Sequence, residues 1–436
     1  MKLLLLTPQL PYPPHQGTTI RNFNILKGLA ARHEIHLLSF GEPEELADSP
    51  LPQYCKRIEI VAPPVRTLMQ RAVETFLSPL PDMARRLHSP TMTAKYARLQ
   101  SENRYDVIQI EGIEMAPYWS QSSHRPQATG HRSQATSHTL QATGHQLQAP
   151  GNLEPATRNL QPVPVFDDHN AEYVLQKTAY EADRKNARRL HAALYSYIQW
   201  HKLARFEREL CLRAGHVVAV SQYDANAIHH LDPRIQPVVI PNGVDVEYYI
   251  PSTEVCAKPL ADLSAVFTGK MDFRPNIDAA TWFAHEILPA LRREIPLAHI
   301  SFVGQKPSPR VQALADEPGV EVTGWVPDTR PYIADAAVYA VPLRMGGGTR
   351  LKVLEAMAMG KAIVSTTLGA EGIEYIRDRD LVIADGPEEF ARAIAALLRN
   401  PDRRRELGAN ARKLAEEKYD WNKLVPLFET LYALAR

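Results

Sequence analysis

One stretch of the sequence, Pro342–Gly372, holds the residue types best suited to binding a phosphate group. An apolar run leads into three consecutive glycines, Gly346–Gly348, and apolar residues at helical spacing begin at Leu351. The start of such a helix offers free N–H groups and the positive end of its dipole, and glycines let the backbone approach an anion closely. Arg350 and Lys352 add positive charge. The stretch therefore predicts a loop that binds a diphosphate.

Two familiar phosphate loops do not fit this stretch. A Walker loop needs a lysine followed by serine or threonine, whereas Gly348 is followed by Thr349 and Arg350. A Rossmann fingerprint needs spaced glycines, and these are contiguous. A plain flexible loop remains the alternative interpretation.

The segments around this loop alternate between strands and helices, which predicts an α/β protein with two doubly wound sheets whose ligands lie beyond the carboxyl ends of the strands. The strands expected in the first half are Leu3–Thr7, Ile35–Phe40, Arg57–Val61, Asp106–Glu111, Val217–Ser221 and Val238–Ile240. Those expected in the second half are Ser264–Thr268, His299–Val303, Val320–Thr323, Ala337–Val341 and Leu381–Ile383, with Val364 in a further short strand. The longer helical segments expected are Thr19–Arg32, Pro64–Leu99, Ala171–Arg213, Ile277–Glu294, Glu388–Leu398 and Arg403–Lys418.

Length and composition narrow the class of protein. A chain of 436 residues is long enough for two domains, and a net charge of +1 gives no argument for a nucleic-acid partner. Three widely spaced cysteines indicate a reducing compartment, without disulfides or a zinc site. No apolar run approaches the roughly 18 residues of a membrane span. The apolar run Leu3–Leu6 is too short for a secretion signal and predicts a buried strand.

Two segments stand apart from this pattern. Gln121–Gln161 repeats QATGH and has almost no large apolar residues, so we expect a disordered surface insertion; metal binding by its histidines is the alternative. Arg184–Arg208 carries seven Lys or Arg residues and one Glu among aromatic residues. It is either a solvated helix face or a basic amphipathic surface for an anionic membrane.

Several motifs together resemble one family, the retaining GT-B glycosyltransferases of family four, also called group 1. Within it the chain looks similar to bacterial sugar transferases that build exopolysaccharide in gene systems linked to exosortase (PEP-CTERM) sorting. The motifs are the proline-rich loop up to Gly17, HN at His169-Asn170, AVS at Ala219–Ser221, IPNGVD at Ile240–Asp245, TGK at Thr268–Lys270, VTGWVPD at Val322–Asp328 and the glycine-rich stretch itself.

The resemblance implies two Rossmann-like domains facing a cleft. The acceptor-side domain would cover residues 1–245, the nucleotide-sugar domain 246–418, and a terminal helix, 419–436, would cross back to the first domain. The implied reaction moves a sugar from a nucleoside-diphosphate donor to a glycan or lipid-linked acceptor, by front-face attack and without a metal or other cofactor. The implied location is cytoplasmic, with weak contact to the inner face of the membrane as an option.

The same resemblance assigns residues. Glu355 matches the glutamate that binds the donor ribose, Lys270 the cation that neutralises the leaving diphosphate, and His169 the histidine that faces the transferred sugar. The remaining substrate-binding positions are Gly17, Arg274, Gly324, Trp325, Val326, Gly346, Gly347, Gly348, Thr349, Arg350, Leu351 and Lys352. Each also has a plain interpretation: a surface glutamate, a loop cation, a core histidine or a solvated helix start.

Two departures from the family pattern bear on specificity. The family commonly has a second glutamate eight positions before Glu355, where this chain has Gly347. It also commonly has a lysine five positions after Lys270, where this chain has Pro275, with Arg274 beside it. Arg274, Arg350 and Lys352 are the candidates for that charge. A nucleotide-sugar epimerase, a phosphorylase and a non-catalytic scaffold are the competing functions.

Overall fold

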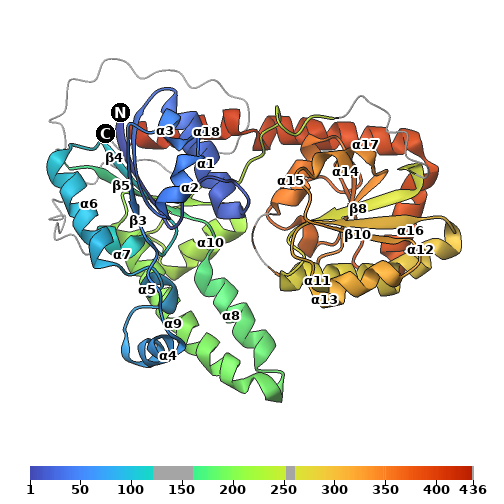
Figure 1. Ribbon diagram of the computed structural model, residues 1–436, viewed down its shortest axis with the longest axis horizontal. Helices are drawn as coiled ribbons and strands as arrows, with labels where there is room; N and C mark the ends of the chain where they lie inside the picture. Colours follow the sequence, from blue (N-terminus) through green and yellow to red (C-terminus); the bar gives the residue numbers. More distant parts are fainter. Residues whose placement is uncertain (121–160, 252–260, 347, 349, 435–436) are drawn as a thin grey trace.

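The computed structural model describes residues 1–120, 161–251, 261–346, 348 and 350–434. These residues form two parallel β-sheets, one in each half of the chain, with helices packed on both faces (Figure 1). The expected pair of doubly wound α/β domains is confirmed. The low-complexity insertion, apart from its last residue, lies outside the described residues, as do Gly347 and Thr349.

The first sheet has seven parallel strands in the order β3-β2-β1-β4-β5-β6-β7. They are β1 Lys2–Thr7, β2 Glu34–Phe40, β3 Arg57–Val61, β4 Val107–Glu111, β5 Val163–Asp168, β6 His216–Ala219 and β7 Val238–Val239. The Leu3–Leu6 run is fully buried in β1, as a strand covered on both faces requires.

Helices enclose this sheet from both sides. They are α1 Gly17–Ala30, α2 Pro43–Ala47, α3 Leu51–Tyr54, α4 Leu68–Leu77, α5 Asp82–Arg85, α6 Pro90–Glu102, α7 Ala116–Ser120, α8 Glu172–Asp183, α9 Leu190–Arg213 and α10 Gln222–Leu231. Because side chains alternate along a strand, Leu3 and Leu5 pack toward α1, whereas Leu4 and Leu6 pack toward α6, α9 and α10.

Two predicted helices are divided in the structure. The expected helix over Pro64–Leu99 is three helices, α4, α5 and α6, because prolines fall at and between their ends. The expected helix over Ala171–Arg213 folds back on itself as the hairpin α8–α9, joined by a short 3-10 turn at Ala187–Arg189. Folding back stacks Tyr180 on Trp200, with ring centroids 6.1 Å apart, and so partly covers the aromatic side of both helices.

The second sheet has six parallel strands in the order β10-β9-β8-β11-β12-β13. They are β8 Ser264–Thr268, β9 His299–Val303, β10 Val320–Gly324, β11 Val338–Val341, β12 Ala362–Ser365 and β13 Val382–Ile383. The helices are α11 Arg274–Trp282, α12 Leu288–Glu294, α13 Pro309–Gln312, α14 Arg330–Asp335, α15 Leu351–Ala358, α16 Pro387–Arg399 and α17 Pro401–Leu414; a π-helical turn joins α11 to α12.

The last described helix, α18 (Trp421–Leu434), belongs to the core of the first domain. In Figure 1, α17 lies along the second domain and α18 continues over the first. Phe428 and Tyr432 are fully buried beside the leucines of β1. A Cβ at Gly28 of α1 would come within 2.6 Å of Val425, so glycine lets the two helices pack closely.

Candidate active site between two switch points

Each sheet reverses its strand order at one point, between β1 and β4 in the first domain and between β8 and β11 in the second. Loops that leave such neighbouring strands diverge and form a crevice beyond their carboxyl ends. Lys270 follows β8, and the three glycines follow β11. Gly17 lies after β1, and His169 directly follows β5, the neighbour of β4. The structure therefore places these predicted residues at or beside the two switch points.

The glycine-rich loop enters α15 through backbone angles that favour glycine. Gly346 has a φ of 104° and Gly348 a φ of 81°. Arg350 is the residue before the helix, so the free N–H groups of the first turn, which begins at Leu351, lie at the end of this loop. The described part of the loop thus has the geometry of an anion site.

Lys352 lies in the first turn of α15 with its amine turned inward. Its Nζ donates to Asn276 Oδ1 at 3.0 Å and lies 4.0 Å from the centroid of the Phe267 ring. Burial, together with the positive charge of Arg350, lowers the pKa of Lys352 to about 7. Near neutral pH this side chain is therefore divided between its amine and ammonium forms.

Lys270 is the exposed counterpart of Lys352. Half of its side chain is exposed, and its Nζ lies 3.6 Å from Asp272 Oδ1. Such a cation is screened by water but can turn toward a ligand at low cost.

Asn276, which the sequence analysis missed, ties the two lysines together. Its Nδ2 donates to the backbone carbonyl of Lys270 at 2.9 Å, and its Oδ1 accepts from Lys352. A Cβ at Gly269 would lie 2.8 Å from both Asn276 Nδ2 and Lys352 Nζ, so only glycine fits before Lys270. An asparagine in the first turn of a helix gave no distinctive signal in the sequence.

Glu355 lies one turn after Lys352 on α15 and is partly buried. Burial raises its pKa, while a hydrogen bond from the Tyr249 hydroxyl and the charge of Lys352 act to lower it. Tyr249 comes from the segment that joins the domains, and it too was missed. A carboxylate held in this way, one turn into the helix that follows the glycine-rich loop, is placed to accept hydrogen bonds from a bound ligand.

Arg350 turns into the protein rather than toward solvent. Its Nη2 lies 3.8 Å from Glu371 Oε2, and burial lowers its pKa. Next to Glu371 is a hollow of about 690 Å³, lined by residues that follow β11, β12 and β13, among them Leu343, Thr367 and Asp385. Lys270 and Glu355 do not line this hollow, so it adjoins the switch point without containing it.

The other predicted positions of the second domain are more peripheral. Arg274 is exposed at the first position of α11. Trp325 is 71% exposed after β10, the edge strand of the sheet, and Val326 packs partly against the core. Gly324, at the end of β10, has a φ of 71°. The three residues at and after the end of β10 therefore lie beyond β9 from the switch point, whereas Arg274 follows β8.

His169 belongs to a buried cluster of charges in the first domain. Its Nε2 lies 2.9 Å from Glu111 Oε2 at the end of β4. Asp167, two residues earlier, forms a two-pronged ion pair with Arg21 of α1, with both N–O distances 2.9 Å. Arg21 also donates to the carbonyls of Ile240 and Pro241, which fixes the IPNGVD turn to α1. The buried arginine was missed because it occupies an otherwise ordinary helix.

Two groups of carboxylates in the described residues could suggest a metal. Ligand atoms of Glu111, Asp167 and His169 lie within 4.8 Å of one another, but Arg21 already neutralises Asp167, which makes the group a hydrogen-bonded charge cluster. An Asp-x-Asp triplet occurs at Asp378–Asp380, where Asp380 accepts from the backbone of Ile376 and from Arg379. Metal-independent chemistry stays a prediction.

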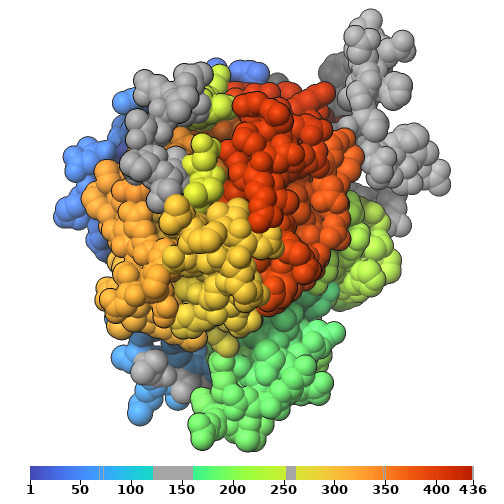
Figure 2. Space-filling model, turned by 90° about the vertical axis from the view of Figure 1, so that its right-hand side faces the viewer, coloured from blue at the N-terminus to red at the C-terminus, as the bar shows by residue number. Residues whose placement is uncertain are grey.

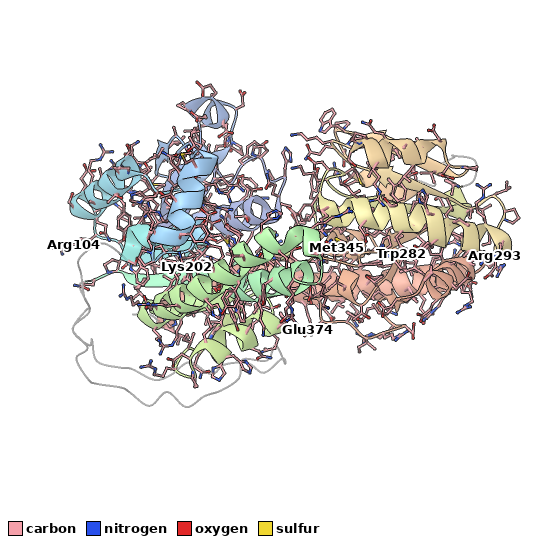
Figure 3. All side chains as sticks on the ribbon, turned by 90° about the horizontal axis from the view of Figure 1, so that it is seen from below. Arg104, Lys202, Trp282, Arg293, Met345 and Glu374 are labelled. Carbon is pink, nitrogen blue, oxygen red and sulfur yellow. The ribbon has the colours of Figure 1, made fainter. Side chains whose placement is uncertain are left out.

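The two switch points face each other across the domains. A Cβ at Gly17 would lie 3.8 Å from Leu351 at the start of α15. A Cβ at Gly348 would lie 2.7 Å from Asn170 Oδ1, the neighbour of His169. Met345, immediately before the three glycines, lies on the side of the second domain that faces the first (Figure 3). A ligand bound by the glycine-rich loop would therefore also meet the first domain.

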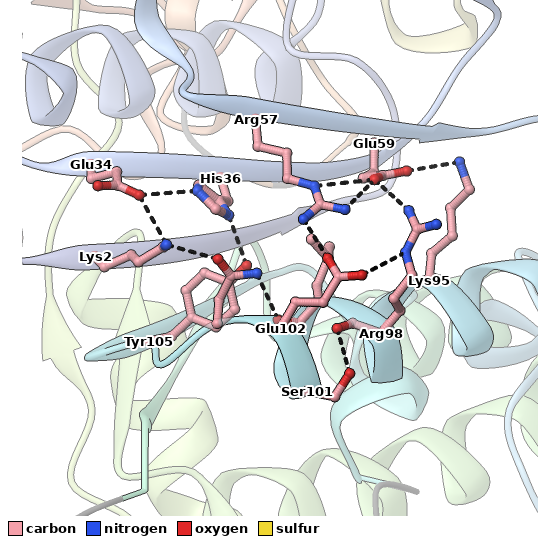
Figure 4. Close-up of polar contacts among 12 residues, drawn as sticks. Lys2, Glu34, His36, Arg57, Glu59, Lys95, Arg98, Ser101, Glu102 and Tyr105 are labelled. Carbon is pink, nitrogen blue, oxygen red and sulfur yellow. Dashed lines mark hydrogen bonds and ion pairs between the residues drawn. The ribbon is translucent and has the colours of Figure 1, made fainter.

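A second charge network of the first domain lies toward the amino ends of the strands and is purely structural. Glu59 accepts from Arg57 and Arg98, and Tyr105 lies 2.8 Å from His36 Nδ1 (Figure 4). Arg57, His36 and Tyr105 lie at or near the amino ends of β3, β2 and β4, away from the switch point. Charge clusters alone are thus not diagnostic, and the position of His169 at the carboxyl edge is what singles it out.

Comparison with known proteins agrees with this geometry. The family model "Glycosyltransferase Family 4" matches residues 16–248, and "Glycosyl transferases group 1" matches residues 262–400. The phosphatidyl-myo-inositol mannosyltransferase of Mycobacterium tuberculosis is 29% identical over 209 residues, 44% of this chain and 54% of that protein. An uncharacterized 44.6 kDa protein in the cps region of Klebsiella pneumoniae is 24% identical over 173 residues, 38% of this chain and 45% of that protein. The chain thus matches about half the length of these curated relatives.

Solved structures share the fold over the whole chain. Sucrose-phosphate synthase from Thermosynechococcus elongatus has a TM-score of 0.68 at 18% identity, covering 100% of this chain and 99% of that one. HepE from Anabaena, solved in complex with UDP, has a TM-score of 0.65 at 16% identity, covering 99% and 100%. Two doubly wound domains whose switch points face each other define the GT-B fold. The chain belongs to glycosyltransferase family 4, whose model covers more than half of its 436 residues.

Proposed function

We propose that this protein moves a sugar, with retention of the anomeric configuration, from a nucleoside-diphosphate donor to a glycan or lipid-linked acceptor. The observation that carries the proposal is the meeting of the glycine-rich loop, Lys270 and Glu355 at one switch point, opposite His169 at the other. We further propose a role in exopolysaccharide or cell-envelope glycan synthesis. The similarity to a protein from a cps region and to a mannosyltransferase supports this setting.

The proposed roles follow from the chemistry of each group. Glu355, held by Tyr249, binds the ribose hydroxyls, and the loop with the N-terminus of α15 binds the diphosphate. Lys270 is free to swing onto the leaving diphosphate as its negative charge grows, which lowers the barrier. Lys352 is the candidate for the second cation. A nucleotide-sugar donor is supported by HepE, a protein of the same fold that was solved with UDP and with UDP-glucose.

His169 faces the transferred sugar in this proposal. No carboxylate is assigned as a nucleophile, and the front-face course of a retaining transfer requires none beside the anomeric carbon. Position 347 is a glycine and therefore offers no carboxylate. Recognition of the sugar hydroxyls would therefore fall to the first domain and to backbone groups.

The protein would work at the inner face of the cell membrane by peripheral contact. No helix in the part of the chain that the structure describes is long and apolar enough to span a bilayer. The α8–α9 hairpin stands out from the body of the molecule (Figure 2, green), and Leu190 and Leu194 near its tip are exposed. Lys202 donates to the carbonyls of Thr75 and Ser78 at the end of α4, so it is not among the cations available to lipid.

A donor panel tests the proposal. Thermal shift with UDP-, GDP- and ADP-sugars ranks the donors, because a ligand of the folded state raises its melting temperature. The best donor is then supplied with membrane-extracted acceptors, and the configuration of the product is read by NMR. Binding without transfer to any acceptor would favour a non-catalytic scaffold, and an inverted product would refute retention.

A further inference from the structure

A chain of buried hydrogen bonds connects the last helix to the proposed sugar-facing histidine. Tyr432 of α18 donates its hydroxyl hydrogen to Gln109 Oε1 in the middle of β4. Gln109 Nε2 donates to Glu111 Oε1, and Glu111 Oε2 lies 2.9 Å from His169 Nε2. All but His169 are fully buried, so each of these bonds is sheltered from competing water.

The direction of these bonds fixes their protons. Tyr432 occupies the amide oxygen of Gln109, so the amide nitrogen of Gln109 must point at Glu111. In the orientation of its amide that satisfies both neighbours, Asn22 also donates to Glu111 Oε2, at 2.8 Å. With donors on both oxygens, Glu111 is set up as the acceptor of the pair, which assigns the shared hydrogen to Nε2 of His169. Burial and the charge of Asp167 raise the pKa of Glu111, and the hydrogen bond with His169 and the charge of Arg21 act to lower it.

We propose that Glu111 is the positioning residue of His169, and that Gln109 and Tyr432 hold Glu111 in the orientation that this requires. The inference rests on the proposed function for its consequence in catalysis. Glu111 fixes the ring and its tautomer, so that Nδ1 is the nitrogen left for the substrate. None of these three residues touches the substrate in this scheme; each acts through His169.

The surroundings reinforce the arrangement. Asp167 from β5, Arg21 from α1, Asn22 beside it and Glu172 at the start of α8 are further polar groups around the pair. Burial acts to lower the pKa of His169, but the hydrogen bond to Glu111 and the negative charge of Asp167 outweigh it, so that pKa is raised. An opposite charge within hydrogen-bond distance favours the charged form of a histidine, and so raises its pKa.

The test uses the full chain with ¹⁵N-labelled histidine. His169 is assigned by its loss in His169→Gln, and its ring tautomer and titration are followed by long-range ¹H–¹⁵N spectra. Three variants are compared: Glu111→Gln, Tyr432→Phe and the control Tyr105→Phe. The control also removes a buried tyrosine hydroxyl bonded to a histidine, His36, but at the opposite edge of the sheet.

In the wild type, we expect the neutral ring of His169 to carry its single N–H hydrogen on Nε2. Glu111→Gln should produce mixed tautomers and lower the pKa of His169 by at least about one unit. It should also cut kcat by about 10- to 100-fold with little change in donor KM, the range for a lost hydrogen bond to a charged group. Tyr432→Phe should move the same signals less, and Tyr105→Phe not at all.

Unchanged tautomer and titration of His169 in both Glu111→Gln and Tyr432→Phe would overturn the inference. The spectra decide this without any transfer assay, so the outcome is independent of whether sugar transfer is found. Should Glu111→Gln fail to fold, Tyr432→Phe, which removes a single hydroxyl, still gives the answer. Changed spectra with unaltered kcat would also refute the positioning role.

Discussion

Donor binding should be coupled to proton uptake through Lys352. The amine of Lys352 is buried beside Asn276 and Phe267, and its pKa is lowered to about 7. At pH 8 it is therefore about nine-tenths neutral before the donor binds. A diphosphate against the amine restores the ammonium form, so binding should take up close to one proton, about 0.9, at this pH. Above pH 7, affinity should fall by up to about tenfold per pH unit.

Isothermal titration with the preferred nucleoside diphosphate measures this uptake directly. Titrations at pH 8 in buffers of different ionisation enthalpy give the number of protons from the slope of the observed enthalpy. Lys352→Met, which keeps the length of the side chain but has no amine, should abolish the uptake. Lys270→Met is the matched control, because it removes the neighbouring exposed lysine and leaves Lys352 in place. Proton-free binding by the wild type at pH 8 would show that Lys352 does not meet the diphosphate.

Three further predictions concern other parts of the chain. Glu355→Ala should mainly weaken donor binding, whereas Lys270→Ala should cut turnover by about 100- to 1000-fold, roughly 2.7–4 kcal/mol of barrier, as measured by steady-state kinetics and calorimetry; wild-type turnover in Lys270→Ala would place the leaving-group cation elsewhere. Vesicle flotation should show binding to anionic lipid that salt reverses, lost when Arg184 and Lys185 become glutamine; equal binding to neutral vesicles would refute a charge-driven contact. A short Gly/Ser linker in place of 121–161 should leave the melting temperature and activity nearly unchanged, and a large loss of either would show that the segment folds or binds.

The sheets and the glycine-rich loop could be predicted because their signals are local. Leu3–Leu6 and the apolar run before Gly346 are continuous along the sequence, and both are buried strands leading to a switch point. The glycine-rich loop was predictable for the same reason, because contiguous glycines before a helix already indicate an anion site.

The partners of the site residues could not be predicted, since each comes from a distant element. Asn276 reaches Lys352 across 76 positions, and Arg21 reaches Asp167 across 146. The break in the long helix after Asp183 could not be predicted either. Helix propensity alone does not show that Tyr180 and Trp200 are more stable stacked on each other than facing water. Tertiary packing decided both.

The placement of α18 has a consequence for how the protein is made. A ribosome completes the second domain before it reaches Trp421, yet Phe428 and Tyr432 fill the core of the first domain. Each such buried side chain contributes about 1.5–3 kcal/mol, a large share of the margin that keeps a domain folded. The first domain therefore stays unfinished during synthesis, with an apolar groove along α1, and chaperones have this interval in which to act on it. Stalling a nascent chain before and after α18 would reveal the moment of closure as a change in protease resistance of residues near Arg21.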